Sequence, residues 1–342
     1  MKKEIKNIEG SVRAKLDNKR KELNIPFLEI LRTYAMERFL YRLSKAAFAK
    51  DFVLKGALLF TAWNVRERRT TIDIDLLAHY SNQISAIEKA VKEVCIVDVV
   101  PDGLRFNTDS VLGAKIKEDA DYEGVRVKFT GFLGKSRIPM QIDFGFGDMT
   151  YPLPKMIDYP VILDFPAPRL KGYAPETVVS EKFEAMVQLG ALNSRMKDFY
   201  DIWLLMRRFE FQGEILSEAL KRTFAQRKID LPQGSNLLAD EIYDEGSDRQ
   251  ILWKAFLTKS GIIDLSSTKD AIEEVNTAFS RAEKCRYTGF HPVFGKEKAS
   301  KHAPDKLATI AKEIEKFLIE PLNALNKGIK FSKEWKAPGP WA

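Results

Sequence analysis

The spacing of apolar residues divides the chain into three parts. Up to residue 48, apolar side chains recur every three or four positions, as on one face of a helix. Between residues 49 and 170 they fall in short runs typical of strands, and from 171 to 342 helical spacing returns. We therefore predict an α+β protein with an N-terminal helical cap (1–48), a core of strands (49–170) and a C-terminal helical domain (171–342). The apolar positions of the cap are Phe27, Ile30, Leu31, Tyr34, Phe39, Leu40 and Leu43.

Two runs in the core predict a β-hairpin, because residues 124–131 and 138–145 are separated by a turn at 133–137. In the second run, alternation places Asp143 on the face opposite its apolar neighbours. Taken alone, such a carboxylate is more often an exposed strand residue. It becomes a candidate third metal ligand, able to help deprotonate an attacking hydroxyl, if its strand adjoins the one described next.

A pair of carboxylates, Asp73 and Asp75, lies in another strand-like run. Side chains alternate along a strand, so this spacing aims both carboxylates the same way, while Ile72, Ile74 and Leu76 point into the core. Two carboxylates on one strand form an oxygen site suited to Mg²⁺. The simpler alternative is a solvated strand face.

A glycine turn precedes this pair. Gly56 allows the backbone to approach a phosphate closely, and a helix beginning near Ala57 would offer its free N–H groups to the anion. A phosphate cradle followed by metal carboxylates on the next strand is the order found in the nucleotidyltransferase fold of the polymerase-beta type.

A helix is predicted from Pro175 to about residue 190, since proline fits the first turn of a helix. Lys182 lies beside the buried stripe of this helix, where it is either solvated or a triphosphate ligand. The buried stripe consists of Val179, Phe183, Met186 and Val187.

A second helix is predicted over residues 196–209, after a loop at Asn193. It places Asp198 and Asp201 on one face, and Tyr200 offers a ring to stack on a base. The alternative for Asp198 is an ordinary acidic residue that interacts favourably with the start of a helix.

The rest of the C-terminal part carries fewer signals. Residues 231–247 are rich in Gly, Asn and Asp and predict a loop, residues 305–324 have the spacing of an amphipathic helix, and the Pro-rich stretch 335–341 is predicted to be extended.

Composition agrees with a folded, soluble protein, because 45% of the 342 residues are hydrophobic and 30% are charged. The sequence shows no secretion signal and no apolar run long enough for a membrane span, so we expect a cytoplasmic protein without a membrane partner. Cys95 and Cys285 are far apart and outside any Cys-x-x-Cys motif, which argues against zinc and a disulfide framework.

The net charge of +7, with a pI of about 9.1, is compatible with a polyanionic partner such as RNA or simply with a basic, soluble protein. Among the basic clusters, residues 66–69 lead directly into the strand of Asp73 and could meet nucleotide phosphates or an acceptor strand.

Five blocks of sequence together resemble the AbiEii/AbiGii-type nucleotidyltransferase toxins of bacterial toxin–antitoxin and abortive-infection systems. The chain departs from the family pattern at Ala57, where Gly or Ser is usual, so a hydroxyl that could touch a phosphate is absent. The matching residues are Leu54-Lys55-Gly56, Arg69-x-Thr71-x-Asp73-Ile74-Asp75-Leu76, Gln141-Ile142-Asp143, Glu181-Lys182 and Asn193-Ser194-Arg195-Met196-Lys197-Asp198-Phe199-Tyr200-Asp201-Ile202.

The resemblance implies a polymerase-beta-like core with a mixed sheet, Mg²⁺ as cofactor and an NTP as substrate. It implies catalytic roles for Asp73, Asp75, Asp143, Lys182 and Asp198, with Asp201 as the alternate to Asp198. The first three of these would hold the metal. The implied nucleotide-binding residues are Lys55, Gly56, Ala57, Arg69, Thr71, Lys182, Arg195, Asp198 and Asp201.

We therefore expect a Mg²⁺-dependent nucleotidyltransferase that transfers NMP to RNA, with the 3′ end of tRNA as the favoured acceptor. Its role as a bacteriostatic toxin with a cognate antitoxin follows from the resemblance alone. Two alternatives remain open. One is nucleotidylation of a protein or small molecule, which would use the same residues, and the other is a non-catalytic nucleotide-binding scaffold, which would not need all three carboxylates.

Overall fold

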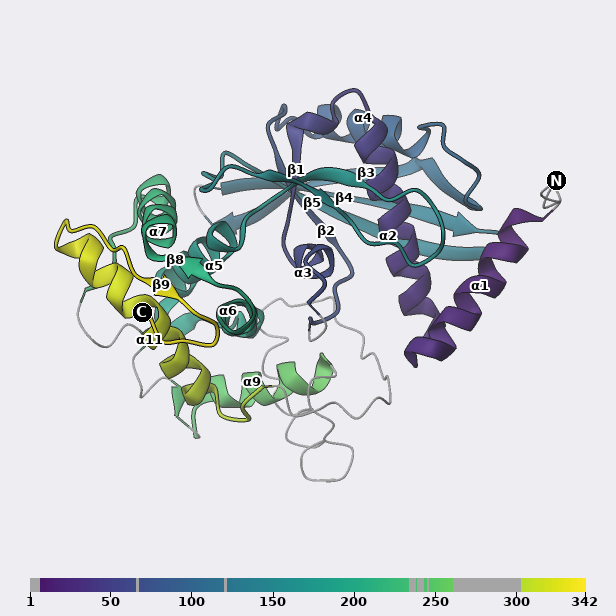
Figure 1. Cartoon of the computed structure of the whole chain (residues 1–342). Coiled ribbons are helices and arrows are strands. Elements are labelled where there is room, and N and C mark those ends of the chain that lie inside the picture. The colour runs from purple at the N-terminus through teal and green to yellow at the C-terminus, as the bar shows by residue number, and fades with distance from the viewer. Residues whose placement is uncertain are drawn as a thin grey trace.

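The computed structural model describes residues 7–65, 68–119, 122–233, 238, 243–244, 246–260 and 303–342. It is an α+β fold, as predicted, with a seven-stranded mixed sheet (Figure 1). Among the described residues, no helix has the length and apolarity needed to cross a membrane.

The strands of the large sheet lie in the order β3-β4-β5-β2-β1-β7-β6, and β8 and β9 form a separate pair. The strands are β1 (Phe52–Lys55), β2 (Ile74–Ala78), β3 (Leu104–Asp119), β4 (Tyr122–Leu133), β5 (Ser136–Phe146), β6 (Lys155–Asp158), β7 (Arg169–Gly172), β8 (Phe211–Gln212) and β9 (Glu334–Trp335).

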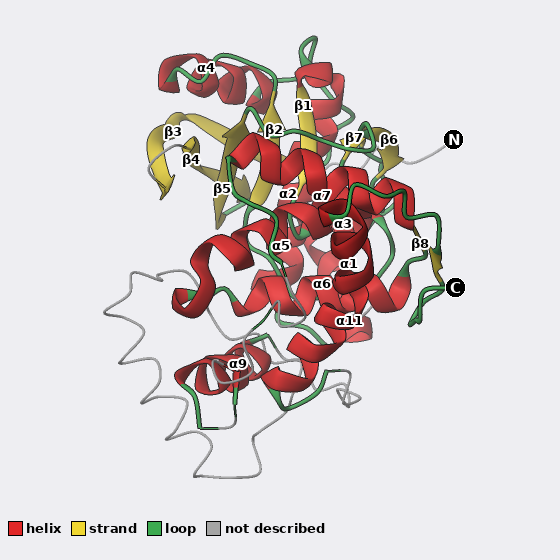
Figure 2. Ribbon diagram, turned by 90° about the vertical axis from the view of Figure 1, so that its left-hand side faces the viewer, coloured by secondary structure: helices red, strands yellow, loops and turns green. Residues whose placement is uncertain are grey.

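Helices lie on both sides of the sheet, with α4 above it and α5 and α6 below it in the view of Figure 1, an arrangement that Figure 2 shows from the side. The helices are α1 (Ile8–Leu23), α2 (Phe27–Lys45), α3 (Leu58–Ala62), α4 (Ile84–Cys95), α5 (Pro175–Leu189), α6 (Met196–Arg208), α7 (Gly213–Arg227), α9 (Asp248–Lys259) and α11 (Leu307–Asn326). Short 3-10 turns occupy Ala49–Asp51 and Gly190–Leu192.

The predicted hairpin is confirmed as β4 and β5, which pair antiparallel around Gly134 and Lys135. The predicted neighbour relation is confirmed too, since β5 pairs parallel with β2 and places Asp143 opposite Asp75. One face of the hairpin is buried because Phe39 of α2 packs against Phe129 at a ring distance of 5.3 Å.

The helical predictions for the C-terminal part are confirmed by α5, α6 and α11. Most of the predicted loop at 231–247 lies outside the described residues, as does Cys285, while Cys95 is buried and unpaired. The end of the chain is anchored, because Trp335 and Trp341 are buried against Phe317 of α11.

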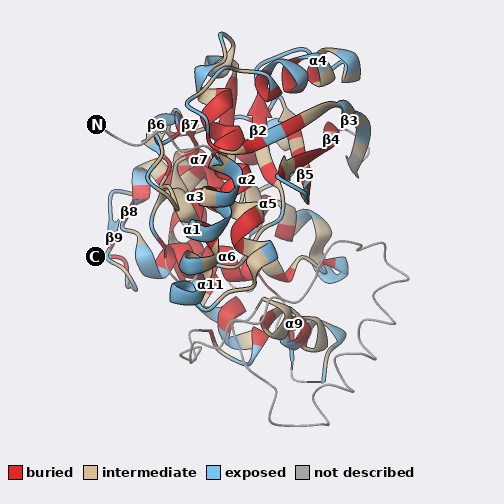
Figure 3. Cartoon of the chain, turned by 90° about the vertical axis from the view of Figure 1, so that its right-hand side faces the viewer, coloured by how far each residue is buried: buried red, intermediate tan, exposed pale blue. Residues whose placement is uncertain are grey.

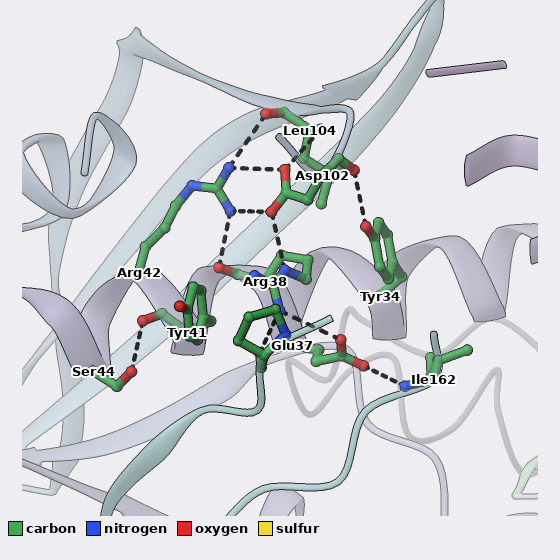
Figure 4. A network of polar contacts seen from close by, with 10 residues as sticks. Tyr34, Glu37, Arg38, Tyr41, Arg42, Ser44, Asp102, Leu104 and Ile162 are labelled. Carbon is green, nitrogen blue, oxygen red and sulfur yellow. Dashed lines mark hydrogen bonds and ion pairs between the residues drawn. The ribbon is translucent and has the colours of Figure 1, made fainter. Parts of the chain in front are cut away.

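The N-terminal cap is joined to the sheet by a buried ion-pair network (Figure 4). Arg38 and Arg42 are one helical turn apart on α2 and both bind Asp102, at 3.0 and 2.7 Å. Although burial raises the pKa of Asp102, the hydrogen bonds and charges of the two arginines hold it below its ordinary value. Glu37, on the same helix, accepts a hydrogen bond from the Ile162 amide at 2.7 Å.

Glu37 makes the stability of the cap dependent on pH. Burial raises its pKa to about 7, against the opposing effects of the Ile162 amide and the Arg38 charge. Since the pKa is raised in the folded state, ionising Glu37 destabilises the fold as pH rises from about 4.5 through 7. In the wild type, we expect the free energy of unfolding to fall by up to about 3 kcal/mol between about pH 5 and pH 8 because Glu37 ionises. Glu37→Gln should remove this fall.

Urea unfolding at several pH values measures this effect, with Glu22→Gln on the exposed side of α1 as the matched control. The control is expected to follow the wild type. Parallel pH profiles for wild type and Glu37→Gln would show that Glu37 ionises normally in the folded protein.

Candidate active site

Three carboxylates meet on the face of the sheet opposite the hairpin's buried side. Asp75 lies on β2, Asp143 on β5, and Asp73 immediately before β2. Their ligand oxygens all lie within 4.8 Å of one another. The predicted cluster of Asp73, Asp75 and Asp143 is thus present, and it has only oxygen donors, as Mg²⁺ prefers.

One part of the prediction for this strand is wrong. Ile74 and Leu76 are fully buried, but Ile72 is 38% exposed. The strand begins only at Ile74, so the alternation of a strand does not extend back to Ile72. In the segment before the strand, the hydroxyl of Thr71 donates a hydrogen bond to the carboxylate of Asp73.

The carboxylates are in an unfavourable electrostatic environment. Burial raises the pKa of Asp75 to about 7, and the charges of Asp73 and Asp143 add to the shift. The charges of Lys197 and Lys55 oppose it. Because repulsion among clustered carboxylates is what a divalent cation relieves, these residues fit a metal site.

Arg126 completes a row of charged residues across four strands, and the sequence analysis did not assign it a role. Its Nε and Nη2 atoms donate to the two oxygens of Asp143, at 2.8 and 2.6 Å. The row runs Lys55, Asp75, Asp143 and Arg126, each residue opposite the next in register. Arg126 could have been found from the hairpin turn, because the Leu133–Ser136 pair fixes the Arg126–Asp143 pair.

Gly56 is required by Asp75. It has a φ of +70°, which favours glycine, and a Cβ at this position would collide with the carboxylate of Asp75. The predicted helix after the turn is the five-residue α3, with Ala57 as its N-cap. Gly56 therefore leaves the space that the carboxylate of Asp75 occupies. This role does not depend on a contact between the turn and a phosphate.

Lys55 lies at the edge of a second charged cluster. Its Nζ is 2.6 Å from Asp148, which also binds Arg227 at 3.0 Å. Asp148 accepts a hydrogen bond from Tyr173 at 3.3 Å. Burial raises the pKa of nearby Glu181 to about 7, although the charge of Lys55 opposes the shift. The lysine predicted to bind nucleotide is thus positioned by Asp148, a partner distant in sequence.

Lys182 is the centre of a basic network that joins α5 to α6. Its Nζ lies 2.7 Å from Asp198 and 2.8 Å from Asp201, whose carboxylates are buried. Arg195 binds Asp198 at 2.6 Å, and Arg69 binds Asp201 through two hydrogen bonds of 3.1 Å. Although burial raises the pKa of Asp198, Lys182 and Arg195 bring it far below its ordinary value.

This network, Arg69, Lys182 and Arg195 with Asp198 and Asp201, is electrostatically linked to the carboxylate cluster. The charge of Asp73 acts on the pKa of Arg69, and Lys197 acts on both Asp75 and Asp198. The network brings three positive side chains to two carboxylates, so it is positively charged overall.

The structure does not support the predicted stacking role of Tyr200. Tyr200 cannot stack on a base, because it is fully buried between Trp203 and Phe256, at ring distances of 5.9 and 5.8 Å. Its helix turns it into the core, one residue away from Asp201. In the basic cluster at 66–69, Arg66 and Glu67 lie outside the described residues, and Arg68 donates to the carbonyl of Val65.

A mixed sheet that carries clustered carboxylates beside a positively charged network can hold a metal and oppose the charge of phosphates, as a nucleotidyltransferase requires. The chain belongs to the family of AbiEii nucleotidyl transferase toxins of type IV toxin–antitoxin systems, whose sequence profile matches residues 38–274. The resemblance seen in the sequence is thereby confirmed. The chain is a nucleotidyltransferase, and an antitoxin is its expected partner.

No curated protein matches the chain in sequence. Two crystal structures from Helicobacter pylori are similar to it. JHP933 has 14% identity and a TM-score of 0.38, with 85% of this chain and 93% of JHP933 covered. A protein proposed to be a nucleotidyltransferase has 15% identity and a TM-score of 0.37, with 76% of this chain and 98% of that chain covered.

Proposed function

We propose that this protein is a Mg²⁺-dependent toxin that transfers NMP from an NTP to RNA, with the 3′ end of tRNA as the favoured acceptor. The observation that carries the proposal is the cluster of Asp73, Asp75 and Asp143 on one face of the sheet. Its role in a toxin–antitoxin system comes from the family, and we propose abortive infection as the biological setting. We also propose that it acts in the cytoplasm, where NTPs and tRNA are present.

Asp73, Asp75 and Asp143 are the residues that would hold the metal. Bound there, Mg²⁺ would neutralise charge on the NTP phosphates during transfer. Asp143 is the carboxylate proposed to accept the proton of the attacking hydroxyl, while Arg126 fixes its orientation through two hydrogen bonds.

The basic network is proposed to stabilise the pyrophosphate leaving group. Arg69, Lys182 and Arg195 are held in place by Asp198 and Asp201, so their charges are fixed before the substrate arrives. Asp198 thus acts by positioning the cations, and Asp201 does the same for Arg69 and Lys182. The Gly56 turn, with Lys55, Ala57 and Thr71, is proposed to contact the nucleotide beside the metal.

Nucleotidylation of a protein or a small molecule would use the same carboxylates. The net charge of +7 favours RNA over these acceptors, because cations that neutralise phosphates supply most sequence-independent RNA affinity. A non-catalytic scaffold would not require three clustered carboxylates, and it is disfavoured for that reason.

The experiment that tests the proposal is incubation of purified protein with each α-³²P-labelled NTP, Mg²⁺ and a bacterial extract. We expect label in small RNA, loss of labelling with EDTA, and recovery when Mg²⁺ is restored. Label in protein would overturn the RNA acceptor, and the absence of any labelled product with all four NTPs would overturn the transferase activity.

A further inference from the structure

The face of β3, β4 and β5 that carries Asp143 extends away from the carboxylate cluster. Most of its residues have no role in the proposed reaction. On β5 the buried positions alternate with outward ones, and β4 follows the same alternation from Val125 to Phe129 but not at Thr130, which is buried. The outward positions of β5, from Asp143 back to Arg137, are intermediate or exposed. Figure 3 shows exposed and intermediate positions along β3, which forms the edge of the sheet.

This face carries a series of cations. Lys128 and Gln141 form the next pair on this face after Arg126 and Asp143. Lys128 lies two residues after Arg126 on β4, and Gln141 lies two residues before Asp143 on β5. At the far end of the face Arg137 pairs with Phe132, which in turn pairs with Arg105 of β3. We call Arg105, Lys128 and Arg137 the cationic ladder, and all three side chains are exposed.

The charge on this face is almost entirely of one sign. Among its register-paired positions whose side chains the structure describes, Asp143 is the one acidic residue, and it is bound to Arg126. Opposite charges would normally be interspersed on a solvated sheet face to limit repulsion between like charges. An excess of cations at these paired positions therefore fits a polyanion.

The geometry fits an extended strand rather than a compact anion. Arg137 lies six positions before Asp143, which corresponds to about 20 Å along a β-strand. Arg105 lies over the ring of Phe132 at 4.6 Å, so the far end of the ladder has an aromatic surface as well as charge. Cations spread over an extended surface together with an aromatic ring are the features with which proteins bind single-stranded nucleic acid.

We propose that the cationic ladder holds the single-stranded segment that precedes the 3′ hydroxyl of the RNA acceptor and directs that hydroxyl toward Asp143. This inference rests on the proposed transfer to RNA and specifies where the acceptor lies. It differs from the expectation that residues 66–69 meet the acceptor, since the ladder lies on β3, β4 and β5. Arg126 lies where the ladder meets the carboxylate cluster.

The test is a triple variant, Arg105→Ala, Lys128→Ala and Arg137→Ala. The matched control is Lys221→Ala, Lys316→Ala and Lys327→Ala, three exposed lysines of the C-terminal helices. Fluorescence anisotropy measures binding of a single-stranded RNA with a free 3′ hydroxyl at several salt concentrations. The same proteins are assayed for NTP binding and for transfer of labelled NMP to that RNA and to tRNA.

We expect the ladder variant to bind RNA at least about tenfold more weakly than the wild type. Its plot of log affinity against log salt should be shallower by about 2, because each lost phosphate contact on a single strand contributes about 0.7. The KM for RNA should rise while NTP binding is unchanged. The control should keep the wild-type salt slope, even though it loses the same number of charges.

Equal RNA affinity and salt slope in wild type and ladder variant, with RNA labelled by both, would overturn the ladder and leave the proposed function intact. If the wild type labels protein and no RNA, both the cationic ladder and the proposed transfer to RNA are overturned. If the triple variant melts early, the double variant Lys128→Ala, Arg137→Ala, which preserves the contact between Arg105 and Phe132, is measured instead. It should show about two thirds of the slope change expected for the triple variant.

Discussion

Replacing Asp75 with Asn is expected to abolish nucleotidyl transfer and to raise the melting temperature of the metal-free protein. Metal-held charge stabilisation is worth several kcal/mol in such sites, so activity should fall at least about a hundredfold. Stability should rise because Asn cannot carry the charge that burial and Asp73 disfavour.

The gain in stability should depend on pH in a defined direction. The pKa of Asp75 is raised to about 7, so its ionisation destabilises the fold progressively as pH rises from about 4 through 7. Asp75→Asn should therefore gain most at about pH 8 and little at about pH 5. Differential scanning fluorimetry without metal, and again with Mg²⁺, measures this gain beside the activity assay.

Asp109→Asn, an exposed acidic residue on β3, serves as the control and should leave both activity and melting temperature unchanged. Added Mg²⁺ should stabilise the wild type and the control more than Asp75→Asn, because the variant has lost a ligand. Full activity in Asp75→Asn together with a large loss of stability would assign this carboxylate a structural role.

Much of the fold could be predicted because its signals are local. The alternation along β4 and β5, the proline at the start of α5 and the apolar spacing of α11 each depend on residues within one element. The error at Ile72 arose where a strand begins, since alternation alone does not define the end of a strand. The burial of Tyr200 could not be predicted from its own helix, because one of the rings that cover it, Phe256, comes from α9.

The site could be predicted only in part. The carboxylates share one strand or adjoining strands, so their meeting followed from the register. The partners of the cations could not be predicted in the same way. Lys55 binds Asp148 and Arg69 binds Asp201, and each pair joins elements whose packing is set by the whole core. Residues predicted as direct phosphate ligands are therefore found in ion pairs.

Lys182 shows what such pairing means for mutagenesis. Lys182→Ala should reduce transfer at least about a hundredfold. It should also destabilise the protein, which would not be expected if Lys182 only bound the nucleotide. Both Asp198 and Asp201 are almost completely buried and would lose one of their partners. Removing one partner from a buried ion pair typically costs about 3 to 5 kcal/mol, and here Arg69 and Arg195 remain to offset part of it.

Two further variants separate catalysis from stability. Lys182→Arg keeps the charge and can still bind both carboxylates, so its melting temperature should stay near that of the wild type. Its transfer rate should still fall, because a planar guanidinium does not reproduce a compact ammonium group. The double variant Lys182→Ala, Asp198→Asn should regain part of the stability without regaining activity, since one of the two carboxylates that lost Lys182 no longer carries a charge.

The exposed Lys221→Ala on α7 controls for the loss of a lysine and should match the wild type in melting temperature and rate. Rates are measured at a temperature at which every variant is folded, so that unfolding does not imitate a catalytic defect. If Lys182→Ala is destabilised but transfers NMP at the wild-type rate under those conditions, Lys182 stabilises the contact between α5 and α6 and takes no part in the reaction. A loss of rate in the stable Lys182→Arg variant would instead show that the reaction depends on the lysine itself, because the ion pairs that hold the two helices together are retained there.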